Sequence, residues 1–443
     1  MRFIADFHLH SKYSRATSKE MDLENMEKWA RIKGVKVIGT GDFTHPLWFR
    51  ELREKLEEAE PGLFRLRNAK KELARLKNGF DFSGGVGFGK KDDEVRYLLT
   101  SEISCIYSKN DRTRKVHVLV LAPSLEAVEK INTHLGWIGN LKADGRPILG
   151  LDAKELAKIV LKISNKCLVI PAHAWTPHFS VFGSESGFDS LEECFEEYAD
   201  RIYAVETGLS SDPAMNWRWS ALDKVTLISN SNAHSPAKIG REANVFEGSR
   251  LDYMAIIEAI KKGAEEKRTT LSLVETLEFF PEEGKYHYDG HRDCKKSLKP
   301  EETLVQKGLC PACRKPVTVG VLNRVTKLAD RPEGDRPERI VPFRSLISLE
   351  GIIANAFGVG VNTKKVRKEY EGLINHFGNE LKILMDVAVK EIEGVSLAEI
   401  AEGIRRVREG KVRINPGYDG EYGEINIFSE KERGSFFKQA SLF

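Results

Sequence analysis

Short apolar runs with strand-like composition recur along the first part of the chain, and helical patterns separate many of them. The strand-like runs cover residues 3–10, 35–40, 97–100, 116–121, 167–170, 202–205 and 225–229. The helical patterns cover residues 18–34, 47–77, 151–163 and 251–263, and the first of them has Ser18 as its expected N-cap. Strands that alternate with helices predict a mostly parallel α/β sheet. This many units over residues 1–280 predict a barrel.

Side chains that can bind a metal lie at or near the ends of these runs. His8 and His10 are spaced by one residue, so both imidazoles leave the same face of the first strand. Further donors accompany the later runs: Asp42, Glu102, His117, His173, Glu206, Asn232 and His234. The rim of a barrel would bring these O and N donors together around a cluster of metal ions. Each residue alone is equally typical of a core histidine or of a capped or salt-bridged surface group.

In this order the motifs resemble those of the polymerase-and-histidinol-phosphatase (PHP) family. The matching residues are His8-Leu9-His10, Gly41-Asp42, Ser101-Glu102, His117, Ala172-His173 and Asn232-Ala233-His234. The resemblance implies a distorted (β/α)7 barrel with two or three divalent metals (Zn, Mg or Mn) that hydrolyses phosphoesters. It implies metal binding by His8, His10, Asp42, Glu102, His117, His173 and His234, with Asp42, Glu102, Asn232 and His234 as the catalytic residues. For Glu206 a metal-binding role and a structural role both stay open.

Position 232 departs from the family pattern, which usually reads Asp-x-His where this chain has Asn232 and His234. The amide oxygen of Asn232 can still coordinate a metal, so Asn232 stays in the expected ligand set. It lacks the negative charge that holds a cation and could orient a water molecule. We interpret Asn232 as an inactivating substitution, introduced to trap a substrate complex.

Residues 281–330 contain a metal motif of a different kind. His291, Cys294, Cys310 and Cys313 follow the pattern H-x2-C, fifteen residues, C-x2-C, which is typical of a tetrahedral structural zinc site. His287 is the alternative to His291. A site closed by four protein ligands predicts one structural Zn ion without a catalytic role.

A Pro- and Arg-rich linker at residues 330–342 leads into an expected helical DNA-binding domain, residues 331–428. A helix over 346–357, a Gly358-Val359-Gly360 turn and a second helix capped by Thr363 resemble a helix-hairpin-helix module. An ordinary helical hairpin would have the same pattern. The residues expected to bind DNA are Gly358, Gly360, Lys364, Lys365, Arg367, Lys368, Arg405, Arg406, Arg408, Lys411 and Arg413. The net charge is only +3, so the local clusters of cations, and not the overall composition, indicate a polyanionic substrate.

The last segment, residues 429–443, is expected to be a tail. Its end is similar to the start of a sliding-clamp-binding peptide, in which Gln439, Leu442 and Phe443 would contact the clamp. The usual second aromatic residue is missing, so a frayed tail is the alternative.

Composition excludes several classes of protein. Of the 443 residues 41% are hydrophobic and 30% charged, which is typical of a soluble globular protein. No apolar run approaches the roughly 20 residues of a membrane span, and the N-terminus is unlike a signal peptide. We therefore expect a cytoplasmic protein without a membrane partner. The abundance of Lys, Arg and Glu, with Gln only at Gln306 and Gln439, is typical of thermophiles.

Barrel, zinc module and basic helical region together resemble the archaeal DNA repair endonucleases of the PHP family. The distinctive stretches are residues 39–46, 171–177 and 413–423. The resemblance implies metal-dependent nicking of DNA on the 5′ side of deaminated bases (uracil, hypoxanthine, xanthine) and abasic sites, with base flipping. The alternatives are a PHP phosphatase of the histidinol-phosphate type and a DNA-binding protein with a decayed barrel. Base-stacking candidates, which could equally be core residues, are Trp175, Phe179, Trp217 and Trp219.

Overall fold

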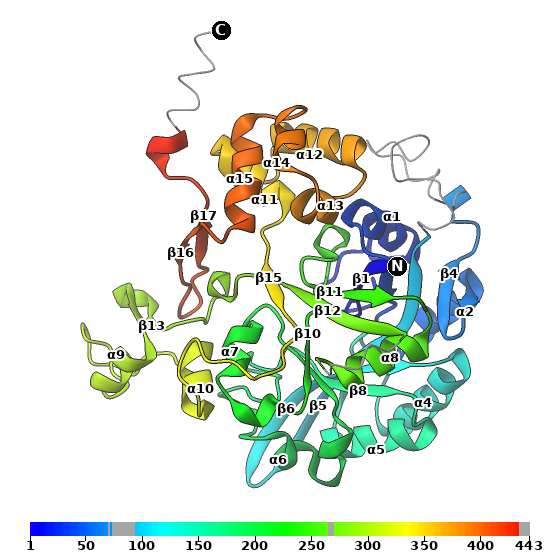
Figure 1. Cartoon of the computed structure of the whole chain (residues 1–443). Coiled ribbons are helices and arrows are strands. Elements are labelled where there is room, and N and C mark those ends of the chain that lie inside the picture. Colours follow the sequence, from blue (N-terminus) through cyan, green and yellow to red (C-terminus); the bar gives the residue numbers. More distant parts are fainter. Residues whose placement is uncertain (70, 73–93, 265–269, 434–443) are drawn as a thin grey trace.

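The main sheet is mixed, and it differs in this from the mostly parallel sheet that we predicted. The computed structural model describes residues 1–69, 71–72, 94–264 and 270–433 (Figure 1). Strand β1 (Arg2–Asp6) is parallel to β2 (Val37–Gly39), and β2 is parallel to β5 (Arg96–Lys109). Strand β6 (Arg112–Ala122) is antiparallel to β5 and to β8 (Leu168–Pro171). The reversal occurs because both turn residues between β5 and β6 have positive φ angles, 53° and 55°, which is the geometry of a tight hairpin turn.

Backbone hydrogen bonds continue the series of strands from β8 back to β1. Beyond β8, the Ala174 amide donates to the carbonyl of Glu206 at the end of β9 (Ala204–Glu206). Strand β9 is parallel to β10 (Thr226–Ile228), and beyond β10 the Ala233 amide donates to the carbonyl of His8. The strands that precede or carry the predicted metal-binding residues therefore follow one another in space in the order β1, β2, β5, β6, β8, β9 and β10.

Helices flank these strands, and three of the four helical predictions are confirmed. Helix α1 (Leu23–Lys33) ends at Gly34 as expected, but Asp22 caps it in place of Ser18, because the Asp22 side chain accepts from the Asn25 amide. Helices α5 (Ala153–Ile163) and α8 (Tyr253–Lys262) lie where their patterns predict.

The predicted helix over residues 47–77 is wrong between residues 56 and 68. Residues 69, 71 and 72 are again helical, and residues 70 and 73–77 lie outside the described residues. Helix α2 (Pro46–Lys55) ends early, and a hairpin of β3 (Leu56–Glu60) and β4 (Leu63–Leu66) follows and joins the sheet beside β5. Charged residues between the apolar positions suggested a helix, whereas burial of Leu56, Phe64 and Leu66 against the core selects the strands.

The remaining elements of the first 280 residues extend the sheet or cover it. They are α4 (Leu125–Ile138), β7 (Ile148–Leu149), α6 (Leu191–Phe195), α7 (Pro213–Trp217), β11 (Ala243–Gly248) and β12 (Leu271–Glu278). Strand β11 is antiparallel to β1 and to β12. In the part of the chain that the structure describes, no helix has both the length and the apolar character needed to cross a bilayer.

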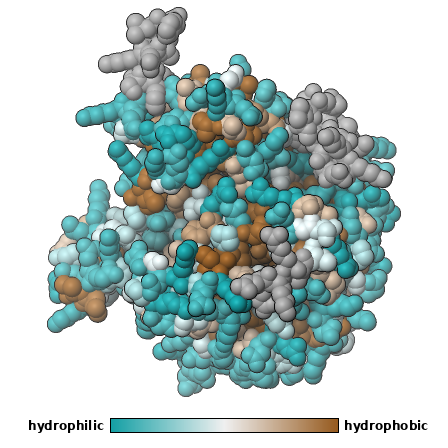
Figure 2. Space-filling model, in the orientation of Figure 1, coloured by the Kyte–Doolittle hydropathy of each residue, from teal (hydrophilic) through white to brown (hydrophobic). Residues whose placement is uncertain are grey.

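The segment that carries the Cys/His motif is a small module beside the sheet. It contains β13 (Asp289–His291), β14 (Lys296–Leu298), α9 (Pro300–Val305) and α10 (Val321–Leu328). Its own buried cluster consists of Leu298, Cys310 and Val317. Helix α9 projects from the molecule, and its exposed Leu304 and Val305 form the hydrophobic patch at the left edge of Figure 2.

The C-terminal region is helical, as predicted, and it contacts the rest of the molecule at several places, among them α13 (Glu380–Met385) against α1. Its elements are β15 (Phe343–Ser345), α11 (Leu349–Phe357), α12 (Lys364–Phe377), α13, α14 (Val389–Glu393), α15 (Ala398–Arg408), β16 (Arg413–Asn415) and β17 (Glu424–Asn426). Strand β15 pairs with β12, and the β16–β17 hairpin returns to the Cys/His module, where the Tyr288 amide donates to Gly417 (Figure 1). Residues 330–342 form neither helix nor strand, and the domain boundaries at 280, 330 and 428 stay predictions.

Candidate active site

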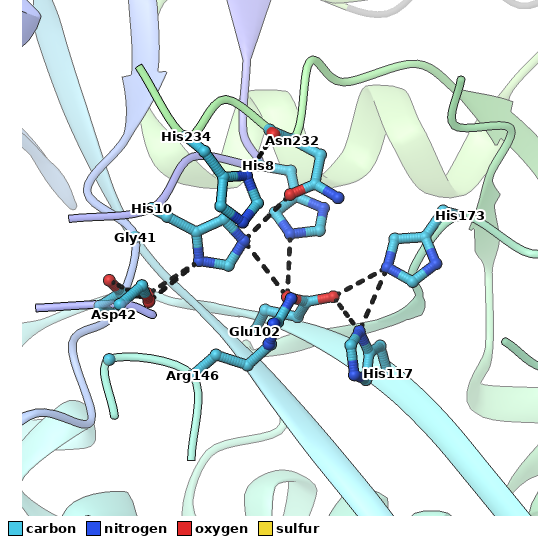
Figure 3. Close-up of polar contacts among 12 residues, drawn as sticks. His8, His10, Gly41, Asp42, Glu102, His117, Arg146, His173, Asn232 and His234 are labelled. Carbon is cyan, nitrogen blue, oxygen red and sulfur yellow. Dashed lines mark hydrogen bonds and ion pairs between the residues drawn. The ribbon is translucent and has the colours of Figure 1, made fainter. Parts of the chain in front are cut away.

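Glu102 lies at the centre of a group of buried imidazoles (Figure 3). Its Oε1 is 2.7 Å from His117 Nδ1 and 2.9 Å from His173 Nε2. Its Oε2 is 3.3 Å from His10 Nε2 and 3.6 Å from His8 Nε2. Each oxygen of this one carboxylate faces a different pair of imidazoles, which is the arrangement that a carboxylate bridging two metal ions would need.

A second set of predicted residues surrounds His10. Its Nδ1 is 3.2 Å from Asp42 Oδ1, and its Nε2 is 3.0 Å from the amide oxygen of Asn232. The ring of His234 lies 4.3 Å from the ring of His10, between centroids. The other oxygen of Asp42 accepts from the amide and hydroxyl of Ser11, at 2.6 Å each. The structure thus brings predicted donors that follow or belong to six strands, β1, β2, β5, β6, β8 and β10, to one place.

Three of these residues have a left-handed backbone, a feature that the sequence did not indicate. The φ angles are 48° at Asp42, 32° at His173 and 46° at Asn232. Non-glycine residues rarely adopt this conformation, and where they do the strain is often concentrated at functional sites.

Glu206 contacts His8 on the side of the ring that faces away from Glu102. Its Oε2 is 3.0 Å from His8 Nδ1 and accepts from the His173 amide, while its Oε1 accepts from the side-chain amide of Asn230. A carboxylate on Nδ1 fixes the imidazole with Nε2 directed at the opposite side, as the outer carboxylates of metal sites do. This geometry favours the positioning role among the two roles left open for Glu206.

The donor set fits divalent cations. The Nε2 atom of His8 is buried and has no hydrogen-bond partner among the described residues, which is costly unless a cation binds there. Although burial alone would lower the pKa of His8, Glu206 and Glu102 raise it to about 10, so this position attracts positive charge. The donors form two sets, and within each set the donor atoms lie within 4.8 Å of one another. The first set is His8, His10 and Glu102, and the second is Glu102, His117 and His173.

The carboxylate itself is held in its charged form. Burial would raise the pKa of Glu102, but its interactions with His117 and His8 and the hydrogen bond from His10 hold it well below its usual range. His117 has its pKa lowered to about 4, because burial outweighs its contact with Glu102. An ionised carboxylate beside a neutral imidazole is the combination that a metal ligand set requires.

Arg146 also belongs to this site, although no pattern in the sequence indicated it. Its Nη1 donates to Glu102 Oε2 at 3.1 Å, and Figure 3 shows the side chain directed at the carboxylate. Arg146 belongs to the irregular segment between α4 and β7, which has no periodic pattern. Guanidinium groups are common ligands of phosphate oxygens in proteins.

The Cys/His module brings its four predicted ligands together. One donor atom each from His291, Cys294, Cys310 and Cys313 lies within 4.8 Å of the others, whereas the alternative ligand His287 is not in this group. Although burial raises the pKa of the Cys310 thiol, the backbone amides of Cys313 and Ala312 outweigh it and lower the pKa. The set fits a tetrahedral zinc ion.

The cations at the start of α12 lie on the surface. Thr363 caps α12 as predicted, with its hydroxyl accepting from the Val366 amide. The preceding turn and the first turns of the helix expose Gly358, Gly360, Lys364, Lys365, Arg367 and Lys368. This exposed edge can reach a polyanion.

The second predicted basic cluster makes contacts within the protein. Arg405 pairs with Glu402 and Glu409, and Arg406 pairs with Glu402 and Glu432. Arg408 donates to the backbone carbonyls of Ile383, Leu384 and Val387 and so holds the end of α13. Lys411 and Arg413 are exposed. A role in DNA binding stays a prediction for all five, and the clamp residues Gln439, Leu442 and Phe443 lie outside the described residues.

Parts of the chain match curated proteins. Residues 348–411 match a family model described as the MJ0043 C-terminal domain. The chain is 33% identical over 265 residues to the uncharacterized protein MJ0043 of Methanocaldococcus jannaschii. That match covers 58% of this chain but only 32% of MJ0043, about a third of its length. The chain is 28% identical over 439 residues to the uncharacterized protein YqxK of Bacillus subtilis, which covers 96% of this chain and 99% of YqxK.

Two solved structures match nearly the whole chain. The lesion-specific endonuclease PfuEndoQ from Pyrococcus furiosus is 29% identical with a TM-score of 0.81, covering 98% of this chain and 99% of that one. Endonuclease Q in complex with a 27-mer duplex substrate that has an abasic lesion at the active site is 30% identical with a TM-score of 0.80. That match covers 97% of this chain and 98% of the other.

Proposed function

The chain belongs to the endonuclease Q family, and from this we propose that it is a metal-dependent DNA repair endonuclease. It would hydrolyse the phosphodiester on the 5′ side of deaminated bases (uracil, hypoxanthine, xanthine) and of abasic sites. The observation that carries the proposal is the single buried carboxylate, Glu102, with one pair of imidazoles facing each of its oxygens. It lies in a chain that matches, over 97% of its length, an enzyme solved with an abasic duplex at its active site.

The metal-binding residues in this proposal form two connected sets. His8, His10 and Glu102 would hold one ion, and Glu102, His117 and His173 a second. Divalent metals bound there would supply a Lewis acid for the phosphoryl group and a water of lowered pKa. Asp42, Asn232 and His234 surround His10 and would complete a site for two or three divalent ions. One structural zinc ion would bind at the Cys/His module.

The protein's own groups would then bind and orient the phosphate. The guanidinium of Arg146 has N–H donors besides the one that bonds to Glu102, so it can also donate to a phosphate oxygen at the cluster. Glu206 and Asp42 keep the His8 and His10 rings in place through their Nδ1 atoms. The exposed start of α12 would hold DNA phosphates farther along the duplex through Lys364 and neighbouring cations.

Asn232 is proposed to keep the activity of this chain low. Its amide oxygen is 3.0 Å from His10 Nε2, close enough to take part in the site, but it brings no negative charge. Asn232→Asp would restore that charge, and we expect cleavage to rise about 100-fold. Equal activity of the two proteins would contradict this proposal.

The function is tested with end-labelled duplexes that contain one deoxyuridine, one deoxyinosine or one abasic site, in Mg²⁺, Mn²⁺ or Zn²⁺. Both the chain as it stands and its Asn232→Asp variant are assayed, with an undamaged duplex and histidinol phosphate as controls. We expect a nick on the 5′ side of the lesion that leaves a 3′-hydroxyl and a 5′-phosphate. Hydrolysis of the phosphate monoester without nicking, or tight binding to DNA with no cleavage by either protein, would reject the proposal.

A further inference from the structure

Phe179 is the one base-stacking candidate that lies at the metal cluster. Its ring centroid is 4.9 Å from that of His117, and the side chain is half-buried. Trp175 and Trp219 are buried against each other in the core, with ring centroids 6.0 Å apart, and Trp217 packs on Phe343. The structure therefore separates Phe179 from the other three.

The backbone of Phe179 is held in a strained conformation. Its φ angle is 61°, which is unfavourable for a bulky side chain. The flanking contacts enforce it: the His117 amide donates to the Phe179 carbonyl at 3.1 Å, and the Phe179 amide donates to the Ser186 hydroxyl. Strain of this kind persists only where the surrounding structure imposes it, and it is concentrated at functional sites.

Backbone hydrogen bonds and a ring contact hold the segment that carries Phe179. The Phe182 amide donates back to Ala174 at 2.9 Å, and the Phe188 amide donates to Val181 at 2.7 Å. The guanidinium of Arg114 lies over the Phe188 ring, 4.1 Å from its centroid. The loop thus presents an aromatic ring beside a predicted metal ligand in a fixed orientation.

Lys115 accompanies the ring. It precedes His117 by two residues on β6, so both side chains leave the same face of that strand. Its Nζ lies over the Phe179 ring, 5.3 Å from the centroid. Among the described residues no carboxylate forms an ion pair with Lys115, so the ammonium is free to donate hydrogen bonds to a ligand.

We propose that Phe179 and Lys115 form the recognition site for the base of the damaged nucleotide once it has left the helix. This inference rests on the proposed function. If the scissile phosphate binds at the cluster, the extruded base on its 3′ side is the base nearest to it. Stacking on a phenylalanine accepts purines and pyrimidines alike, which suits a site that takes uracil and hypoxanthine.

Lys115 would supply the discrimination. Deamination replaces an amino group of the base, a hydrogen-bond donor, by a carbonyl, an acceptor. An ammonium has three donors and no acceptor, so it can bond to the carbonyl of uracil, hypoxanthine or xanthine but not to the amino group of the normal base. A base stacked on this face of the Phe179 ring would take the place of Nζ, and the flexible lysine side chain would then bring the ammonium to the edge of the base.

The proposal is tested by binding, which does not depend on the activity of this chain. Affinities of the full chain with Mn²⁺ are measured by fluorescence anisotropy for duplexes that contain deoxyuridine, deoxycytidine or a tetrahydrofuran abasic site. We expect Phe179→Leu to weaken binding to the deoxyuridine duplex about 10-fold. Binding to the abasic duplex, which has no base to stack, should stay within about twofold, and Phe179→Trp should restore the affinity for deoxyuridine.

Lys115→Met should lower the preference for deoxyuridine over deoxycytidine about 10-fold and leave the abasic duplex little affected. The matched control is Phe49→Leu, the same change at a half-buried phenylalanine of α2. The metal content of each variant is also measured, and it reports whether His117 still binds a metal ion.

Three results would overturn the inference. Equal losses on deoxyuridine and abasic duplexes would mean that Phe179 only positions His117, and unchanged affinities would mean that the ring does not meet the base. If the parent chain binds damaged and undamaged duplexes equally, the proposed function itself fails and the inference fails with it. If the parent chain prefers the damaged duplex but the variants behave unexpectedly, only the roles of Phe179 and Lys115 are rejected, and the proposed function stands.

Discussion

The metal-binding residues around Glu102, here called the barrel cluster, are held in a different way from those of the Cys/His module. In the barrel the donors are spread from His8 to His234 and come from several strands. All of them are buried except Asn232 and His234, which are half-buried. In the module all four donors lie between His291 and Cys313, and the buried cluster around them has only three residues. The sheet can fix the barrel donors before any ion binds, whereas so small a core leaves the ion to supply the folding energy of the module.

The largest expected effect is on catalysis at the barrel. Glu102→Gln removes the charge that faces both imidazole pairs while keeping the shape of the side chain. In the Asn232→Asp background we expect nicking to fall about 1,000-fold, with little change in the melting temperature because the sheet holds the donors. Single-turnover cleavage and thermal unfolding measure the two quantities. A large fall in melting temperature would show that the barrel, too, depends on its metals to fold.

The module is expected to respond in the opposite sense. Cys310→Ser removes a buried thiol and should lower the zinc content by one ion per chain, because a three-ligand site of this size cannot stay closed. We expect backbone hydrogen exchange in residues 287–318 to accelerate about 100-fold while exchange in β1 and β5 stays unchanged. Hydrogen-exchange mass spectrometry and metal analysis check this. Cys167→Ser, at a buried cysteine outside both groups, is the control and should keep the zinc count.

The two regions should also differ in the sign of their pH dependence. Burial raises the pKa of Glu278, on β12, to about 7, from an ordinary value of 4.5. The folded state then keeps a proton that the unfolded chain loses between these values, so the free energy of unfolding of the barrel decreases as the pH rises through this window. The module needs deprotonated thiols and a neutral imidazole, so its metal affinity increases with pH.

Glu278→Gln tests the barrel side of this contrast. The amide cannot ionise, so we expect the variant to be about 3 kcal/mol more stable than the parent at pH 8 and nearly equal to it near pH 4.5. Denaturant unfolding at a series of pH values, monitored on the barrel, gives the curve. A pH profile that the substitution leaves unchanged would assign the dependence to another group.

How far the sequence predicts the site depends on whether a residue belongs to a regular element. Glu102 and His117 lie in strands, and His8 and His10 follow the end of β1 by two and four residues, so the strand patterns were enough to place them together. Arg146 reaches the same carboxylate from an irregular segment, and no local pattern indicates where such a segment folds. In physical terms, strand register places the first group, whereas loop packing places Arg146.

The same limit explains two other differences. The helix predicted over residues 47–77 becomes partly a hairpin because burial against distant strands outweighs local helical propensity. Arg408 was grouped with DNA-binding cations because its neighbours in sequence are basic. Its partners are carbonyls at residues 383–387, which only the packing of α15 on α13 brings near.

The smallest expected effect concerns the link between the two regions. The side chain of Asp419, in the turn between β16 and β17, accepts from the Arg292 amide and from the Thr318 hydroxyl, at 2.6 Å each. Both partners belong to the module, so this carboxylate holds the hairpin on it. Asp419→Asn keeps the size but weakens the two bonds, and we expect the module to lose about 1 kcal/mol of stability. Zinc release to a chelator should become a few-fold faster while the melting of the barrel stays constant, and an equal shift of both would show that module and barrel unfold as one unit.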